Sequence, residues 1–172
     1  MRALLGIATV MDGLLAGASV DQSVEQLPSR RRIGVQAYRA YSQSSHMANG
    51  RFWLIPLGIG APILRAIVAL RTKSRGVAGH RAAPVYLAAG LGVAHVASTV
   101  VAARINWSIA PWQPPERWIA DETTLAQVFD RFERWQALRA SLQFLTFAAG
   151  VWALAANSGE YPAPSDGDGS VR

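Results

Sequence analysis

The chain has 172 residues, of which 51% are hydrophobic and only 16% are charged, whereas ordinary soluble domains carry about 25% charged residues. Its charges crowd between long apolar stretches, which is typical of a membrane protein and disfavours a soluble globular fold. The net charge of +6 does not indicate nucleic-acid binding, because the arginines are scattered and form no basic helical stripe.

Four segments are apolar enough to cross a membrane, which takes about 17–25 residues per helix. They lie at about residues 3–20, 52–70, 83–103 and 140–156. Glycine and proline inside them are better tolerated in membrane helices than in soluble ones. The predicted fold is therefore all-α: a four-transmembrane-helix bundle in residues 1–156, followed by a disordered polar tail at 157–172. We expect a multi-pass protein of the cell membrane whose partner is the lipid bilayer.

The first span is interrupted by Asp12. An ionised carboxylate in an apolar medium is costly unless it is paired, hydrated or protonated. A cleaved signal peptide with Arg2 as its basic start is one alternative, but a carboxylate inside its apolar region argues against it. Buried core helices of a soluble protein are another, which the four charge-poor spans disfavour. We therefore interpret Asp12 as a membrane-buried functional carboxylate.

The connectors between the spans are predicted to be partly helical. In the first connector, the stretch RRRIGVQAYRAYSQSSHMA has the mixed polarity of an interfacial helix. In the third, LAQVFDRFERWQALRASL has apolar residues at helical spacing and is expected to run straight into the fourth span. The distribution of arginines leaves the membrane orientation open, and nothing in the sequence indicates an oligomeric state.

The polar residues of the spans are predicted to meet inside the bundle. Residues three, four and seven apart share a helix face, and the faces around Asp12, His95 and Arg139 carry small and polar residues of the kind that packs inward. Asp12 and His95 differ in depth by only about 5 Å at 1.5 Å per residue, so we expect them to share a buried site. Arg65 is expected to extend its charge to the opposite surface and receives no chemical role.

The candidate catalytic residues are Asp12, His95, Asn106 and Arg139; the candidate substrate-binding residues are His46, Asn49, Arg104, Trp107, Trp112 and Trp135. Asp12 or His95 would deprotonate a phenol or an activated carbon, and Arg139 with Asn106 would stabilise the resulting oxyanion. Three scattered histidines predict no metal site, and no phosphate loop, nucleophile elbow or HExxH motif predicts a cofactor. These residues also have structural alternatives. Asp12 and His95 would form hydrogen bonds between helices, Arg104 and Arg139 would bind lipid headgroups, and the tryptophans would form an interfacial belt.

The stretches INWSIAPWQPPERW and DRFERWQALRASLQF resemble a small four-helix membrane family of unknown function that includes anthrone oxygenase-like proteins. In that family an Asn-containing stretch and a Trp-rich segment precede a W-x-x-x-R motif, and the matching residues here are Asn106, Trp112, Trp135 and Arg139. The resemblance extends to about residue 156. It implies an enzyme that oxidises a reduced polyketide aromatic with oxygen and without a recognised cofactor.

One position departs from this pattern. Gln136 stands where family members often carry His or Asn, so a proton-transfer role does not carry over to it. The expected small-molecule partner is a lipophilic aromatic, and no nucleic acid is expected. A proton-coupled carrier that uses Asp12 and His95 as a relay, and a non-catalytic membrane scaffold, are the alternative functions.

Overall fold

The computed structural model describes residues 1–109 and 117–158, except for the side chains of residues 46–49 and 51. The described residues form helices and no strand, which confirms the all-α prediction. In chain order these helices are α1 (Arg2–Asp21), the π-helix η1 (Gln22–Gln26), α2 (Leu27–Ile33), α3 (Val35–Ser42), the π-helix η2 (Gln43–Gly50), α4 (Arg51–Ser74), the 3-10 helix η3 (Gly79–Arg81), α5 (Ala83–Trp107) and α6 (Glu122–Ala156). The predicted polar tail lies outside the described residues beyond Ser158.

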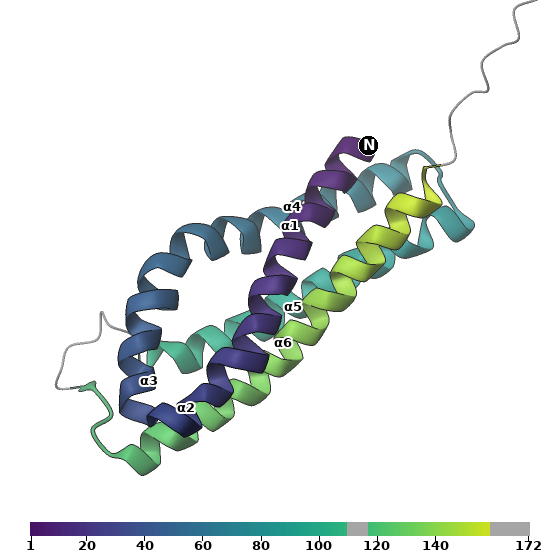
Figure 1. Ribbon diagram of the computed structural model, residues 1–172. Helices are drawn as coiled ribbons and strands as arrows, with labels where there is room; N and C mark the ends of the chain where they lie inside the picture. The colour runs from purple at the N-terminus through teal and green to yellow at the C-terminus, as the bar shows by residue number, and fades with distance from the viewer. Residues whose placement is uncertain (110–116, 159–172) are drawn as a thin grey trace, which may run out of the picture.

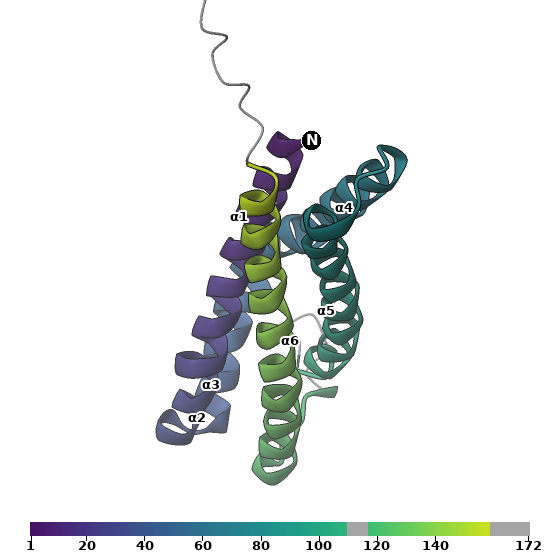
Figure 2. The same ribbon diagram turned by 90° about the vertical axis from the view of Figure 1, so that its right-hand side faces the viewer.

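Four helical segments of the described chain are long and apolar enough to cross a membrane: Arg2–Ile33, Phe52–Ser74, Gly79–Trp107 and Glu122–Ala156. They contain α1, α4, α5 and α6, so the four predicted spans are confirmed as helices. The most extensive contacts join neighbouring long helices in the order α1, α6, α5, α4 around the bundle, with α4 also in contact with α1. Figure 1 shows the elongated bundle that results, and Figure 2 shows α1 and α5 on either side of α6.

The beginning of α1 and the end of α6 lie together at what we call the terminal end of the bundle (Figure 1). There the Arg2 Nε donates to the Asn157 carbonyl at 2.8 Å, and the Asn157 Nδ2 donates to the Arg81 carbonyl at 3.2 Å. The opposite end, where α2, α3 and the start of α6 meet, is the connector end. Depth in the bundle is given below as distance along a helix from the terminal end.

The connector end extends beyond the length of a membrane span. Helix α6 has 35 residues, which at about 1.5 Å per residue is about 52 Å, whereas the hydrocarbon core of a bilayer is about 30 Å thick. The helix begins at Glu122 and is capped by Asp121, whose carboxylate accepts a hydrogen bond from the Thr124 backbone N–H at 2.7 Å. The predicted continuation of the third connector into the fourth span is thus one uninterrupted helix.

A hydrophobic core fills the connector end. Its buried members come from α2, α3, α5, α6 and the segment after α5: Leu27, Tyr38, Ala102, Ile109, Leu125, Phe129 and Phe132. The first connector contains two helices, α2 and α3, because Gly34 between them has a φ of 86°, a conformation that favours glycine. Helix α3 therefore turns Tyr38 inward, and its ring packs edge-on against Phe129 with centroids 5.1 Å apart.

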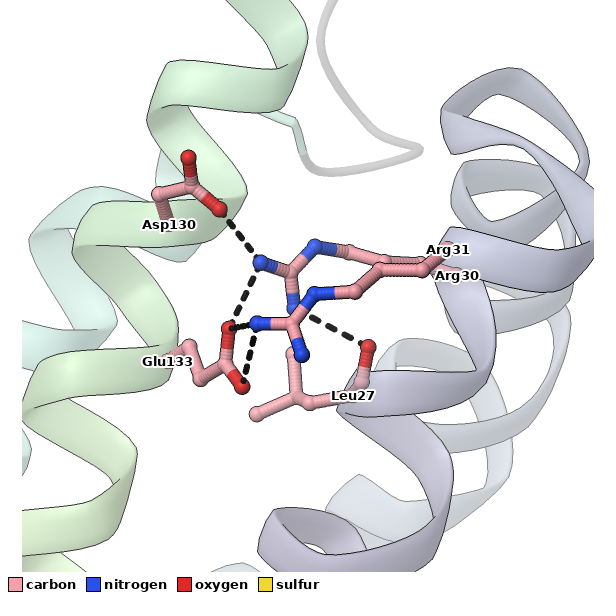
Figure 3. Close-up of polar contacts among 5 residues, drawn as sticks. All are labelled: Leu27, Arg30, Arg31, Asp130 and Glu133. Carbon is pink, nitrogen blue, oxygen red and sulfur yellow. Dashed lines mark hydrogen bonds and ion pairs between the residues drawn. The ribbon is translucent and has the colours of Figure 1, made fainter.

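Charged side chains join α2 to α6 beside this core (Figure 3). The buried guanidinium of Arg30 contacts Asp130, and its Nη2 lies 2.6 Å from Glu133 Oε2. The exposed Arg31 also approaches Glu133, at 3.2 Å. Arg30 in addition donates from Nη1 to the Leu27 carbonyl at 3.0 Å. This arrangement compensates a buried cation with carboxylates, as burial of a charge requires.

We expect Tyr38 to make the protein less stable in alkaline solution. Burial raises the pKa of the Tyr38 hydroxyl from 10.0 to about 12. Between these values the unfolded chain releases the proton and the folded protein retains it, so the free energy of unfolding falls as the pH rises, by on the order of 2–3 kcal/mol. Tyr38→Phe should remove this part of the decline in the free energy of unfolding. Denaturation of both proteins at about pH 9 and about pH 11.5 measures the decline. An equal decline in both proteins would contradict the expectation.

Candidate functional site

A pocket of about 370 Å³ lies between α1, α4, α5 and α6. Its volume is within the range of about 300–1,000 Å³ that small-molecule sites occupy. Most of its wall is apolar: Leu15, Leu54, Ile55, Gly58, Ile59, Val96, Val100 and Ala103. The polar residues that line it are Ser19, His95, Thr99, Arg139 and Gln143. An apolar cavity with a few convergent polar groups is the usual form of a ligand site.

His95 is buried in α5 and is held by side chains of α5 and α6. Its Nε2 lies 3.1 Å from the Gln143 Nε2 and 3.3 Å from the Thr99 Oγ1. With the Gln143 amide nitrogen as donor, the imidazole Nε2 accepts and Nδ1 carries the proton of the neutral ring. With the amide turned, Gln143 accepts and Nε2 carries the proton instead. This Nδ1 is buried without a partner among the described residues. In the first arrangement His95 offers an N–H donor that makes no hydrogen bond of good geometry, and the backbone of Arg139 also interacts with the ring.

Arg139 lies one turn before Gln143 on α6. Its Nη2 donates to the Gln22 Oε1 at 3.2 Å, and Gln22 belongs to the π-helix η1, a type of turn that often marks functional sites. The Arg139 Nε is buried and unpartnered within the described part of the chain. The ion pairs formed there do not include Arg139, whereas the more deeply buried Arg30 and Arg65 both contact carboxylates. The guanidinium thus lies beside an apolar pocket without a counter-charge.

Gln143 is the third pocket-lining residue with such an atom, because its Oε1 is buried and unpaired as well; outside the pocket the same holds for atoms of Arg39, Ser45, Arg65 and Gln136. The pocket-lining residues His95, Arg139 and Gln143 together offer two donors and one acceptor. A buried polar group without a hydrogen bond costs about 1–3 kcal/mol. A ligand that carries an oxygen would satisfy these groups.

A second polar cluster joins α1 to α4. Arg65 Nε donates to Asp12 Oδ2 at 2.7 Å, and Arg65 Nη2 lies 2.6 Å from the same oxygen. Arg65 Nη2 also donates to Thr9 Oγ1 at 3.2 Å. The exposed fractions of Asp12 and Arg65 are 6% and 2%. The prediction that Arg65 reaches the membrane surface is therefore wrong, since its charge is paired inside the bundle.

Helix lengths explain this correction. Helix α4 runs to Ser74, so Arg65 lies nine residues, or about 14 Å, from the terminal end at 1.5 Å per residue. Asp12 lies ten residues from Arg2 in α1, or about 15 Å from the same end. The two antiparallel helices bring both charges to the same depth inside the bundle, where pairing stabilises them.

The shared site of Asp12 and His95 does not form. Asp12 is bound to Arg65 and does not line the pocket, whereas His95 contacts Gln143 and Thr99. A direct relay between them, as the carrier alternative requires, has no contact in the described structure. What the structure does confirm is the inward orientation of both helix faces, since Ala8, Thr9, Asp12, Ala16 and Ser19 on α1 and Ala88, Gly92, His95 and Ala102 on α5 are buried.

The other candidate residues lie away from the pocket. Arg104 and Trp107 are exposed and Asn106 is half-buried at the end of α5, and none of the three lines the cavity. Trp135 packs against the connector-end core. Trp112 and the side chains of His46 and Asn49 lie outside the described residues. Of the candidates, the pocket therefore brings together His95 and Arg139, and their catalytic roles stay predictions.

Gly150 of α6 packs directly against the Asp12–Arg65 pair. A Cβ atom there would overlap the Arg65 guanidinium and lie 2.9 Å from Thr9 Oγ1. We expect Gly150→Ala to lower the free energy of unfolding by about 1–3 kcal/mol, because relief of the overlap pulls Arg65 away from Asp12. Gly90→Ala is the control, since a Cβ at Gly90 meets no atom within 4 Å and alanine favours a helix. Thermal unfolding in detergent checks this, and equal stability of the two variants would contradict it.

Comparisons with protein-family models, with curated proteins and with solved structures gave no match to this chain. The four apolar helices are consistent with a small polytopic membrane protein. Among the described residues, no three His, Asp or Glu side chains lie close enough together to hold a metal ion.

Proposed function

We propose that this chain is a multi-pass protein of the cell membrane that binds a lipophilic aromatic molecule with a hydrogen-bonding oxygen in the pocket between α1, α4, α5 and α6. One observation carries the proposal. Three of the five polar residues in an otherwise apolar wall, His95, Arg139 and Gln143, have a buried polar atom without a described partner. Because such groups are costly when unpaired, an oxygen-bearing ligand is the natural complement of this wall.

The geometry favours a phenol, or a ketone that is its tautomer. The Nε–H of Arg139 and the Nδ1–H of His95 are donors for a phenolate or carbonyl oxygen, and the Gln143 Oε1 is an acceptor for a hydroxyl. Apolar side chains such as Leu15, Leu54 and Ile59 supply the surface against which rings pack. Such a site distinguishes ligands by the presence of the oxygen and tolerates variation in the hydrocarbon part of the ligand.

The resemblance to anthrone oxygenase-like proteins supports a reaction at this site. Anthrone and O₂ would give anthraquinone and water, so that the ring methylene becomes a carbonyl, and its two hydrogens leave with the second oxygen atom. His95 would accept the methylene proton at Nδ1 once the Gln143 amide has turned to accept from Nε2–H, and Arg139 would stabilise the enolate oxygen. Asp12 has no part in this scheme, because Arg65 neutralises it outside the pocket.

Gln136 also stands outside the proposed chemistry. It is fully buried on α6, donates from Nε2 to the Ser19 carbonyl at 3.3 Å, and does not line the pocket. Its described contact is therefore between helices α6 and α1. The departure from the family pattern therefore lies at an interhelical contact, outside the pocket that His95 and Arg139 line.

Binding of anthrone and anthracene to the detergent-solubilised protein tests the proposal. The two molecules share a three-ring skeleton and differ in the oxygen. We expect anthrone to bind about tenfold more tightly or better, because one hydrogen bond to a charged donor contributes about 1.5–3 kcal/mol. Protein-free micelles are the control for partitioning. Equal affinities would overturn the binding proposal, and binding of anthrone without oxygen consumption would overturn the oxygenase activity alone.

A further inference from the structure

The wall of the pocket is buried on one side and exposed on the other. Ser19, His95 and Gln143 are buried, with exposed fractions of 4%, 6% and 5%. In contrast, four pocket-lining residues of α4 and α5 remain on the outer surface of the bundle: Ile55 at 55%, Ile59 at 58%, Val96 at 40% and Val100 at 51%. Since α4 and α5 are spans, their outer surface faces lipid, and the pocket opens sideways into the bilayer between them.

The positions of Arg139 and His95 along their helices place the polar side of the pocket in one leaflet. Arg139 lies 17 residues before Ala156, which at 1.5 Å per residue is about 25 Å from the terminal end of a hydrocarbon core about 30 Å thick. His95 lies 12 residues after Ala83, or about 18 Å from that end. The polar groups of the pocket therefore lie in the leaflet at the connector end, with Arg139 nearer its surface.

The positive charge of Arg139 favours a ligand that carries a negative charge. Arg139 has no carboxylate partner in the described structure, although Arg65, deeper in the same bundle, has Asp12. A cation beside a low-dielectric cavity attracts an anion more strongly than it would in water. A lipid-dissolved molecule with one anionic group matches both the charge and the sideways opening.

We propose that the pocket takes up an amphiphilic organic monoanion, a carboxylate or a phenolate, directly from the connector-end leaflet. Its charged group binds Arg139 and His95, and its apolar part extends between α4 and α5 into lipid. This inference rests on the proposed function and adds the charge of the ligand and its source.

Gly58 gives a way to block the site without disturbing the bundle. It lines the pocket from α4, and a Cβ added there meets no atom within 4 Å. Gly58→Leu should thus fill the cavity and leave the helix packing intact. Gly90→Leu on α5 is the matched control, since it also has open space and does not line the pocket.

Spin-labelled stearic acid in liposomes that contain the full chain provides the test. With the nitroxide near the carboxylate, electron paramagnetic resonance should show an immobilised component for the wild type and for Gly90→Leu, and none for Gly58→Leu. With the nitroxide near the far end of the chain, the label should move as freely as in lipid alone. The methyl ester, which lacks the charge, should show at least a tenfold smaller bound fraction than the acid.

Three results would overturn the inference. These are an immobilised component that persists in Gly58→Leu, equal immobilisation of the acid and its ester, and an immobilised label at the far end of the chain, which would mean a closed pocket. If anthrone binds the wild type and discriminates against anthracene while stearic acid fails these tests, this inference falls and the proposed function stands. If neither molecule binds, both fall.

Discussion

Arg65→Met is expected to lower the free energy of unfolding by about 3–5 kcal/mol, because it leaves the Asp12 carboxylate uncompensated in the membrane interior. The wild-type guanidinium binds Asp12 through Nε at 2.7 Å and also donates to Thr9. Methionine keeps most of the volume of the side chain and removes the charge and the hydrogen bonds. Thermal unfolding of the purified protein in detergent, together with the yield of monodisperse protein, measures the effect.

A double-mutant cycle separates the charge from the packing. Asp12→Leu should also destabilise the bundle, because it leaves the Arg65 charge unpaired. The double variant Asp12→Leu/Arg65→Met should recover most of the lost stability, since replacing a buried ion pair by apolar residues is often neutral or stabilising. If Arg65→Met is as stable as the wild type, or if the double variant is no more stable than either single variant, the pair does not hold α1 to α4 in the way described.

Arg139→Gln is expected to lower the affinity for anthrone about 10- to 100-fold, which corresponds to loss of one charge-assisted hydrogen bond of about 1.5–3 kcal/mol. The affinity for anthracene should stay unchanged, because anthracene has no oxygen to bind. Glutamine removes the charge and keeps an amide donor, but its side chain is shorter than that of arginine, so the contact with Gln22 is weakened as well.

Arg134→Gln is the matched control for this variant. Arg134 is an exposed arginine of the same helix and does not line the pocket, so its replacement removes an equal charge without touching the site. Thermal unfolding of both variants verifies that the bundle is intact. An equal loss of anthrone affinity in the two variants, or a parallel loss of anthracene affinity in Arg139→Gln, would contradict the role given to Arg139.

Hydrophobic pattern predicted the fold well, because the requirement for about 17–25 apolar residues per span leaves few alternatives. The four spans, the long helix that enters the fourth, and the buried faces around Asp12 and His95 all agree with the structure. Periodicity assigns each polar residue to a helix face. It does not determine which faces of two helices meet, and so it did not determine the partner of Asp12.

The Asp12–Arg65 pair could have been predicted by comparing how far the two residues lie along their helices. Counting from the terminal end of each antiparallel helix, and extending the second span to Ser74, places the two charges at nearly equal depth. The contact between Gln22 and Arg139 was harder to predict from the sequence. Gln22 lies in a π-helix, and a 3.6-residue period does not reveal such a turn. The contact between Gln143 and His95 depends on the packing of α5 on α6, which the sequence does not specify.

The central claim is that the pocket lined by His95 and Arg139 holds an oxygen-bearing lipophilic molecule, and photolabelling with benzophenone tests it most directly. Benzophenone is a lipophilic ketone that reacts on irradiation beside its carbonyl group. In the protein reconstituted in lipid, we predict adducts on peptides that contain Leu54–Ile59 and Val96–Ala103, with excess anthrone and Gly58→Leu each suppressing them. Adducts spread over lipid-facing residues such as Val10 and Leu14, unchanged by anthrone, would contradict the claim.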